Sequence, residues 1–416
     1  MSILAINGGT KVRNHPFPKH PTITNEEKTA VMDVLDSGNI STFVASSGDN
    51  FLGGVKIKEF ENNFANFIGT KFAVAFNSAS SALHAAVASV GVRPGEEVIV
   101  PPYTFTSTAT SALMNNSIPV FADVKSDTYC IDPEKIPNVT SKLSKAIIPV
   151  HLFGHPCDMD EIKEYANSNG LKIIEDCAQA PGAEYKGKKV GTLGDCGIFS
   201  FQETKNMMTG EGGMLVTDNE EIVKIARMVR NHGEVLLSSD KSRSYKSEIL
   251  GWGYRMTEME AALGIVQLKK LEKMNDIRIK LADHLTKFIN SIEGLKHTRY
   301  DSVKHVYYVY AFSYNEKTIG ISRKKFCEAM NAEGIPTYGG YVKPLYLNPL
   351  YLEKRAFAFK HYTGNVEYKK GICPTAEYLH EEGLIFIPVC RPPAKIEDMN
   401  DIITTIKKIL ENKNEL

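Results

Sequence analysis

Apolar runs of strand length alternate with amphipathic stretches through the first two thirds of the chain. Seven short runs are apolar along most of their length and are bounded by Gly, Pro or polar turn residues, which predicts strands. These strands are expected at 72–76, 97–100, 119–122, 146–151, 172–175, 197–201 and 213–217. Helical periodicity lies between them, at about 57–68, 80–91, 105–115, 159–169 and 219–231.

This alternation predicts an α/β domain built on a mainly parallel, seven-stranded sheet. Strands that are apolar throughout are buried on both faces, and parallel strands need helical crossovers between them. We therefore expect helices on both faces of the sheet. Ligands bind such sheets at the carboxyl ends of the strands. Residues just after the seven runs are thus the candidates for a functional site.

The pattern changes after residue 255. Helical periodicity over 256–271 and again over 276–292 predicts two connecting helices. Beyond them the pattern predicts strands at 306–312 and 384–389 and helices at 323–331 and 396–410. The predicted division is a large domain at 1–255 that includes the N-terminal segment, connecting helices at 256–293, and a smaller α+β domain at 294–416. The alternative is that the N-terminal segment joins the smaller domain.

Composition and charge narrow the class of protein. The 416 residues carry 49 basic and 49 acidic side chains, so no net field favours nucleic acid or an anionic membrane. No apolar run approaches the ~18 residues that span a bilayer, and the first residues do not resemble a signal peptide. The seven cysteines are scattered and form no C-x-x-C pair, which argues against disulfides and a metal site. We expect a cytoplasmic protein.

Lys205 is the first candidate for chemistry. It follows the apolar run 197–201 and precedes the Gly-Glu-Gly-Gly turn at 210–213, where a solvated surface lysine is not expected. An ordinary lysine is protonated at pH 7 and is a poor nucleophile, whereas a Schiff base with a cofactor aldehyde activates it. This placement points to covalent attachment of pyridoxal phosphate (PLP).

Asp176 closes the run 172–175 and is the second candidate. A carboxylate against a pyridine nitrogen stabilises the protonated ring, which then acts as an electron sink. A strand-end Asp also caps turns and helices, and both interpretations stay open from this residue alone. Gln179, three positions on, is either a hydrogen-bond partner of the ring hydroxyl or a turn residue.

Two further segments follow predicted strands. Asn77–Leu83 is rich in small hydroxyl residues at the start of a helix, where backbone N–H groups and the helix dipole favour a phosphate. An ordinary Ser N-cap gives the same pattern. Phe105, in the segment Val100–Phe105, either stacks on a flat aromatic ring or belongs to the core.

In order and spacing these segments resemble the DegT/DnrJ-type sugar aminotransferases, PLP enzymes that aminate keto-sugars or keto-cyclitols. The most specific part is Ser200-x-x-x-x-Lys205 with its glycine-rich tail. The resemblance covers nearly the whole chain, through the segments Asn77–Leu83, Val100–Phe105, Ile174–Gln179, Phe199–Gly213, Arg230–Gly233 and Leu250–Ala262.

The resemblance implies the fold of the aspartate-aminotransferase type (fold type I) and assigns roles. Lys205 would be the Schiff-base lysine and general base, and Asp176 the partner of the pyridinium nitrogen. Gln179 would bind the ring hydroxyl and Phe105 would stack on the ring. The cofactor phosphate would be held by Ser78, Ala79, Ser80 and Ser200.

Two departures from the family pattern stand out. Ala79-Ser80 replaces the common Gly-Thr of the phosphate loop, which keeps a hydroxyl and a backbone amide. Gly253 replaces an Asn that reaches the phosphate of the neighbouring subunit, which puts a cross-subunit contact through this residue in doubt.

The resemblance also implies a homodimer with active sites at the interface, and glutamate or glutamine as the amino donor. The segments Tyr338–Tyr346 and Cys373–Glu377 are similar to the branch with scyllo-inosose aminotransferases and aminobenzoate-type enzymes. The candidates for a substrate wall there are Tyr341, Lys343 and Tyr346, with loop packing as the alternative for the aromatic pair.

Two other functions are compatible with such a chain. A PLP-dependent sugar dehydratase carries a His in place of the lysine, so Lys205 argues against it. A regulator that keeps the fold without catalysis needs neither Lys205 nor Asp176, and both are present.

Overall fold

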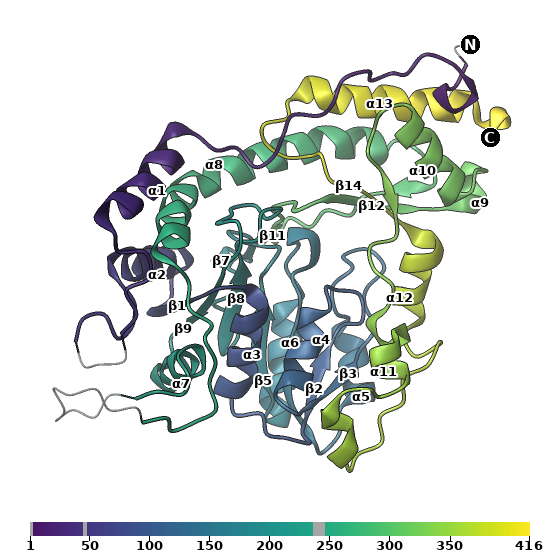
Figure 1. Cartoon of the computed structure of the whole chain (residues 1–416). Coiled ribbons are helices and arrows are strands. Elements are labelled where there is room, and N and C mark those ends of the chain that lie inside the picture. The colour runs from purple at the N-terminus through teal and green to yellow at the C-terminus, as the bar shows by residue number, and fades with distance from the viewer. Residues whose placement is uncertain (1–2, 45–47, 236–245) are drawn as a thin grey trace.

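A seven-stranded sheet lies at the centre of the computed structural model, which describes residues 3–44, 48–235 and 246–416 (Figure 1). In spatial order its strands are β1 (Phe72–Phe76), β9 (Gly213–Thr217), β8 (Cys196–Ser200), β5 (Lys172–Asp176), β4 (Ser144–Ile147), β2 (Glu97–Val100) and β3 (Ile118–Phe121). The seven predicted apolar runs supply these strands. Strand β9 runs antiparallel to β1 and β8, and the other neighbours pair in parallel, so the predicted fold is confirmed.

Helices cover both faces of this sheet. One face carries α3 (Ala79–Ser89), α4 (Ser107–Met114) and α7 (Glu220–Arg230), and the other carries α2 (Val55–Ile68) and the first half of α8 (Glu258–Ile289). Alternate side chains of β1 show the two layers, because Val74 and Phe76 join one core while Ala73 and Ala75 join the other. Two further helices, α5 (Ile136–Val139) and α6 (Met159–Asn169), precede β4 and β5.

The connecting region is one helix and not the predicted two. Helix α8 runs unbroken for 32 residues from Glu258, and Thr257 caps it through a capping box with Glu260. The predicted break at 272–275 is wrong because the polar residues there include no Gly or Pro. Asn275 instead stays helical and donates its amide to the carbonyl oxygen of Pro181 at 2.8 Å.

A smaller antiparallel sheet follows α8. Its strands, in order, are β10 (Leu295–Lys296), β12 (Tyr310–Tyr314), β14 (Leu384–Ile387) and β13 (Tyr338–Gly339). It packs with α10 (Arg323–Ala332) and α13 (Ile396–Glu411), and α9 (Glu316–Ile319) follows β12. A third sheet of β11 (Val303–Lys304), β6 (Glu184–Tyr185) and β7 (Lys188–Lys189) joins the two parts.

The packing crosses the predicted domain boundaries in two places. The N-terminal segment lies on the small domain, as in the alternative given above: the buried Arg13 side chain forms ion pairs with Asp398 and Asp401 at 2.8 and 2.7 Å. In Figure 1 both termini lie beside α13. Conversely, α11 (Pro349–Leu352) and α12 (Pro374–Tyr378) pack on the large core. Helix α1 (Asn25–Ser37), which the pattern did not predict, packs on α8.

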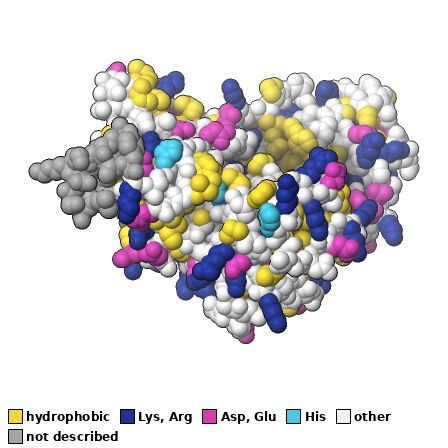
Figure 2. All heavy atoms as spheres, turned by 60° about the horizontal axis from the view of Figure 1, so that its bottom comes forward, with side chains coloured by type: hydrophobic (Ala, Val, Ile, Leu, Met, Phe, Trp, Pro, Cys, Tyr) yellow, Lys and Arg dark blue, Asp and Glu magenta, His cyan; other side chains and the backbone are white. Residues whose placement is uncertain are grey.

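Surface charge agrees with the balanced composition. On the face drawn in Figure 2, basic and acidic side chains are interspersed. Across the described ranges, none of the helices combines the length and the apolar character that crossing a membrane requires.

Candidate active site

A cavity of about 440 Å³ opens at the carboxyl ends of the parallel strands. It collects residues that follow β1, β2, β4, β5 and β8, as the topology of such sheets requires. Nine predicted site residues line it: Ser78, Ala79, Ser80, Phe105, Asp176, Gln179, Ser200, Lys205 and Tyr341. Its other lining residues include Thr104, Gln202, Thr204, Glu211 and Tyr308.

Lys205 enters the cavity from a tight turn after β8. Its backbone N–H donates to the carbonyl oxygen of Gln202 at 2.9 Å, and Gly210 closes the turn in the left-handed conformation at φ +87°. The half-buried ammonium lies 4.4 Å from the centre of the Tyr308 ring. The Tyr308 hydroxyl bonds the hydroxyl of Thr204 at 2.9 Å. Tyr308 therefore limits where the amine can lie.

Asp176 ends β5 and is 4% exposed. Its carboxylate accepts the Thr108 hydroxyl at 2.8 Å and the Ala178 N–H at 3.1 Å. Burial raises the pKa of this carboxyl, while the bonds from Thr108 and Ala178 and the charge of Lys205 lower it. A buried carboxylate on a cavity wall suits a protonated ring nitrogen as its partner. The positive charge of the ring would stabilise the carboxylate in place of the water that burial removes.

The Thr108 hydroxyl is predicted to tune this carboxylate. In a Thr108→Val variant the pKa of Asp176 rises further, because burial is then opposed by one bond fewer. With the predicted role of Asp176 as the ionised partner of a ring nitrogen, the acidic limb of a pH–rate profile is expected to move to higher pH. The rate at neutral pH should fall roughly 10-fold, the value of one hydrogen bond to a charged group. An unchanged acidic limb in steady-state assays would contradict this role.

The start of α3 offers a site for a phosphate. Ser78 is the N-cap and accepts the N–H of Ser81 at 3.1 Å, so the first N–H groups of the helix face the cavity without an intrahelical partner. Gly213 lies against this turn. A Cβ at Gly213 would stand 2.4 Å from the carbonyl carbon of Ser78 and 2.5 Å from the nitrogen of Ala79. Only glycine permits this approach, and Ser200 adds a hydroxyl beside it.

Two further lining residues could contact the ring of a flat ligand. The Phe105 side chain lines the cavity and is 59% exposed, so its ring has surface free for a flat partner to stack on. Gln179 is 3% exposed, accepts the N–H of Phe153 at 2.7 Å and donates to the Tyr341 hydroxyl at 3.0 Å. These bonds fix its amide, whose second N–H hydrogen can still reach a ring hydroxyl.

The three residues predicted for a substrate wall separate in the structure. Tyr341 lines the cavity beside Gln179. Lys343 is exposed and is not part of the cavity lining. Tyr346 is fully buried and its hydroxyl bonds Glu377, so it packs in the core and its predicted role in the wall is corrected.

Thr108 and Tyr308 are functional candidates that the sequence interpretation missed. Thr108 lies one turn after Phe105 in the predicted helix 105–115. Residues three apart share a face of a helix, so this spacing could have indicated that Thr108 lies near the cavity. The sequence pattern placed Tyr308 only within the predicted strand at 306–312. Its neighbour in the cavity, Lys205, is about a hundred residues away in the sequence, and no local pattern reveals such a contact.

Behind Asp176, a buried pair supports the strand. Glu175 accepts the N–H groups of Gly191, Leu193 and Gly194 and the Nε2–H of His151 at 3.0 Å. His151 Nδ1 accepts the Cys157 N–H, which fixes the tautomer. With Cys177 these two side chains also come close enough for a metal ion. Their polar atoms are already hydrogen-bonded, so we interpret the group as structural.

Gly253 lies apart from the cavity lining. It pairs with Asn231, and a Cβ at this position would stand 3.3 Å from the imidazole of His232. The space that an asparagine side chain would enter is thus bordered by His232.

The site residues fit PLP as a resident cofactor. They provide an amine, a buried carboxylate for a ring nitrogen, an exposed aromatic face, and a helix N-terminus that Gly213 leaves open for a phosphate. Each of these four features corresponds to one chemical part of the cofactor.

Known proteins resemble this chain over nearly its full length. The "Uncharacterized protein MJ1066" of Methanocaldococcus jannaschii is 39% identical over 95% of this chain and 98% of its own. The GDP-perosamine synthase of Caulobacter vibrioides is 34% identical, over 80% and 85%. The L-glutamine:2-deoxy-scyllo-inosose aminotransferase of Streptoalloteichus tenebrarius is 31% identical, over 99% of both chains.

The fold is shared with solved structures. The aminotransferase from Psychrobacter cryohalolentis superposes with a TM-score of 0.86 at 30% identity, over 95% of this chain and 99% of its own. The family model described as DegT/DnrJ/EryC1/StrS aminotransferase family matches residues 21–407. The resemblance noted from the motifs is thereby confirmed, and the chain belongs to the DegT/DnrJ/EryC1/StrS aminotransferase family.

Proposed function

We propose that this protein is a PLP-dependent aminotransferase that moves an amino group from glutamate or glutamine to a keto-sugar or keto-cyclitol. The observation that carries the proposal is that Lys205 and Asp176 line one cavity together with the helix N-terminus at Ser78–Ser80. Bound PLP supplies an electron sink for the carbon next to the transferred nitrogen. The residues of the chain supply binding, orientation and proton transfer.

Lys205 moves the proton in this proposal. Its amine enters the cavity beside Tyr308, and a free amine there can take a proton from the donor carbon and return one to the acceptor carbon. Asp176 keeps the ring nitrogen protonated, because its carboxylate is buried and held by Thr108. Phe105 covers one ring face and excludes water from it.

The substrate class follows from the relatives and from the polar cavity wall. The names of two relatives specify a GDP-linked amino sugar and a deoxy-inosose. In this chain Gln202, Thr204, Glu211 and Tyr341 line the cavity beside Lys205 and offer hydroxyl, amide and carboxylate groups. Such groups match the hydroxyls of a sugar or cyclitol. Lys343 can act only where a larger substrate extends beyond this cavity, because it is exposed.

We further propose a homodimer in the cytoplasm. Val55 and Leu250 are 75% and 74% exposed, an exposure of aliphatic side chains that a subunit interface would remove. The seven cysteines are buried and free, which suits a reducing compartment.

A half-reaction test separates the proposed activity from its alternatives. Protein loaded with PLP should convert the cofactor from its aldehyde to its amine form when glutamate or glutamine is added, with a change in the absorption spectrum. A keto-sugar or keto-cyclitol should then restore the first spectrum and yield an amino product. Loss of water from the sugar without a new C–N bond would indicate a dehydratase, and no change with either donor would indicate a regulator.

A further inference from the structure

Two tyrosines of the active-site cavity come from distant parts of the chain. Tyr308 precedes β12, Tyr341 follows β13, and both side chains line the cavity that Lys205 enters. Both are half-buried, so each presents surface to a ligand in the cavity. The hydrogen-bond partners of the two hydroxyls determine which of them can donate to that ligand and which can only accept.

The hydroxyl of Tyr308 is placed to accept from a ligand. Gln202 Oε1 accepts the backbone N–H of Thr204 at 2.9 Å, which identifies this atom as the oxygen of the amide. The Thr204 hydroxyl lies 2.6 Å from the same oxygen and therefore donates to it. Its single hydrogen is then in use, so the Tyr308 hydroxyl, 2.9 Å away, donates to Thr204. The Tyr308 oxygen keeps a lone pair for a ligand.

The hydroxyl of Tyr341 has the opposite polarity. Gln179 Oε1 accepts the N–H of Phe153 at 2.7 Å, so the other end of this amide is its NH₂ group, which donates to the Tyr341 oxygen at 3.0 Å. None of the described residues accepts the hydrogen of Tyr341. Burial raises the pKa of Tyr341, so the phenol keeps this hydrogen at neutral pH. Tyr341 can therefore donate to a ligand.

Core residues hold both tyrosines in place. The carbonyl oxygen of Phe153 accepts the N–H of Tyr308 at 2.7 Å, and the Phe153 ring packs edge-on against Tyr341 with 5.0 Å between ring centres. The backbone N–H of Tyr341 donates to the hydroxyl of Tyr103 at 2.7 Å. Phe153 and Tyr103 are both buried. The two hydroxyls are therefore fixed in position as well as in polarity.

We propose that Tyr308 and Tyr341 select an α-hydroxy ketone, a ketone with a free hydroxyl on a neighbouring carbon, as the amino acceptor. This inference rests on the proposed aminotransferase function. A carbonyl oxygen only accepts, so of the two tyrosines only Tyr341 can bind it. A hydroxyl on the neighbouring carbon can donate, and Tyr308 provides the matching acceptor. The two tyrosines are thus specificity-determining residues that fix how the ketone lies in the cavity.

The position of Lys205 brings the reacting carbon near Tyr308. The Lys205 amine, which moves the proton at that carbon, lies 4.4 Å from the centre of the Tyr308 ring. Substituents on the carbons beside the ketone are therefore the groups that the Tyr308 hydroxyl can meet. A ketone without such a hydroxyl leaves the Tyr308 oxygen unpaired, and a site built to bind a hydroxyl rejects an analogue that lacks it. Free hydroxyls beside the ketone are thus preferred over deoxy or O-alkyl carbons.

Single-turnover kinetics of the protein loaded with pyridoxamine phosphate tests the proposal with two small ketones. Hydroxyacetone carries a hydroxyl beside the carbonyl, and methoxyacetone keeps that oxygen but replaces its hydrogen by a methyl group. Hydroxyacetone should convert the cofactor to its aldehyde form roughly 10-fold or more faster, the value of one hydrogen bond. The same two reactions with free pyridoxamine phosphate in solution correct for the intrinsic reactivity of each ketone.

Variants separate the two roles. In Tyr308→Phe the ratio of the two rates should fall to the value in free solution, because the ring stays while the acceptor is lost. In Tyr341→Phe both rates should fall by the same factor, roughly 10-fold, because both ketones keep the carbonyl oxygen. Thr204→Val leaves Tyr308 in place but releases its hydrogen, so the ratio should narrow. A purely structural role of Tyr308 would lower both rates without changing their ratio.

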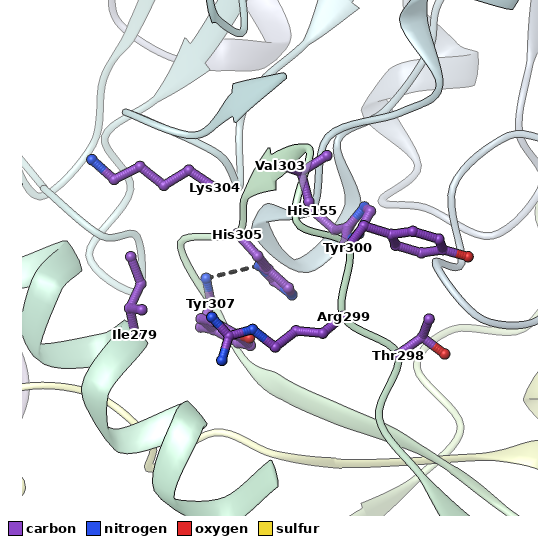
Figure 3. A pocket seen from close by; sticks show the side chains of 9 residues that line it. All are labelled: His155, Ile279, Thr298, Arg299, Tyr300, Val303, Lys304, His305 and Tyr307. Carbon is purple, nitrogen blue, oxygen red and sulfur yellow. Dashed lines mark hydrogen bonds between the residues drawn. The ribbon is translucent and has the colours of Figure 1, made fainter. Parts of the chain in front are cut away.

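Tyr300→Phe is the matched control. Tyr300 lines a separate pocket, drawn in Figure 3, that shares no lining residue with the active-site cavity, and its hydroxyl bonds Asp127. Its rates and their ratio should equal those of the wild type. No reaction with hydroxyacetone, equal corrected rates for the two ketones, or an unchanged ratio in Tyr308→Phe would each overturn the proposal.

The half-reaction of the PLP-loaded protein with glutamate or glutamine is measured in parallel. If it proceeds while the ketone ratio does not behave as expected, only the acceptor assignment fails. If the donor reaction fails as well, the aminotransferase function fails with it.

Discussion

Replacement of Lys205 by alanine is expected to lower the transamination rate by on the order of 10⁴-fold. The variant loses the group that holds the cofactor aldehyde and the group that moves the proton. No other lysine lines this cavity among the described residues, so no neighbouring amine can take its place. The fold should persist because Lys205 is half-buried at the end of a turn and its backbone bond to Gln202 remains.

Borohydride reduction of the loaded wild-type protein should fix the cofactor on the peptide that contains Lys205, as read by mass spectrometry. In Lys205→Ala a small primary amine should restore part of the activity, because it can enter the space left by the side chain. Lys189→Ala is the matched control: Lys189 also lies over an aromatic ring, at 3.9 Å from the centre of Phe67, but outside the cavity. Substantial turnover in Lys205→Ala without added amine would refute the assignment.

Most of the predicted site residues that line the cavity lie at or just after the ends of strands. Asp176 and Ser200 are the last residues of β5 and β8, and Phe105 and Ser78 follow β2 and β1 within a few residues. Their positions are set by local pattern, since an apolar run fixes the strand and parallel pairing brings the strand ends together. The fold and the residues around the cavity could therefore be predicted from local patterns, although these residues are far apart in the sequence.

The substrate wall could not be predicted in the same way. Tyr341 and Tyr346 are five residues apart in one aromatic segment, yet one faces the cavity and the other the core. What separates them is the buried bond from Tyr346 to Glu377, a partner 31 residues away. The sequence pattern left open whether the N-terminal segment joins the large or the small domain, and the contacts of Arg13 with its distant carboxylates decide for the small one. Such pairings depend on tertiary contacts that periodicity does not encode.

Asp176→Asn is expected to slow the half-reaction with glutamate or glutamine by roughly 10²- to 10³-fold, a typical value for loss of one preorganised charge. An amide cannot stabilise a protonated ring nitrogen as a carboxylate does, so the electron sink is weakened while the amine of Lys205 stays in place. The asparagine oxygen can still accept from Thr108 or Ala178, which keeps the end of β5 intact. Cofactor content should therefore change far less than rate.

Stopped-flow absorption of the loaded protein after addition of the amino donor measures this rate directly. Asp123→Asn is the matched control, because Asp123 is equally buried at 4% exposure and follows β3 at the same edge of the sheet. Its carboxylate accepts the N–H groups of Thr375 and Ala376 and does not line the cavity. The control should lose stability with little loss of rate per folded molecule. Equal slowing in both variants would mean that Asp176 acts through the fold, whereas selective slowing in Asp176→Asn assigns the effect to its charge beside the ring nitrogen.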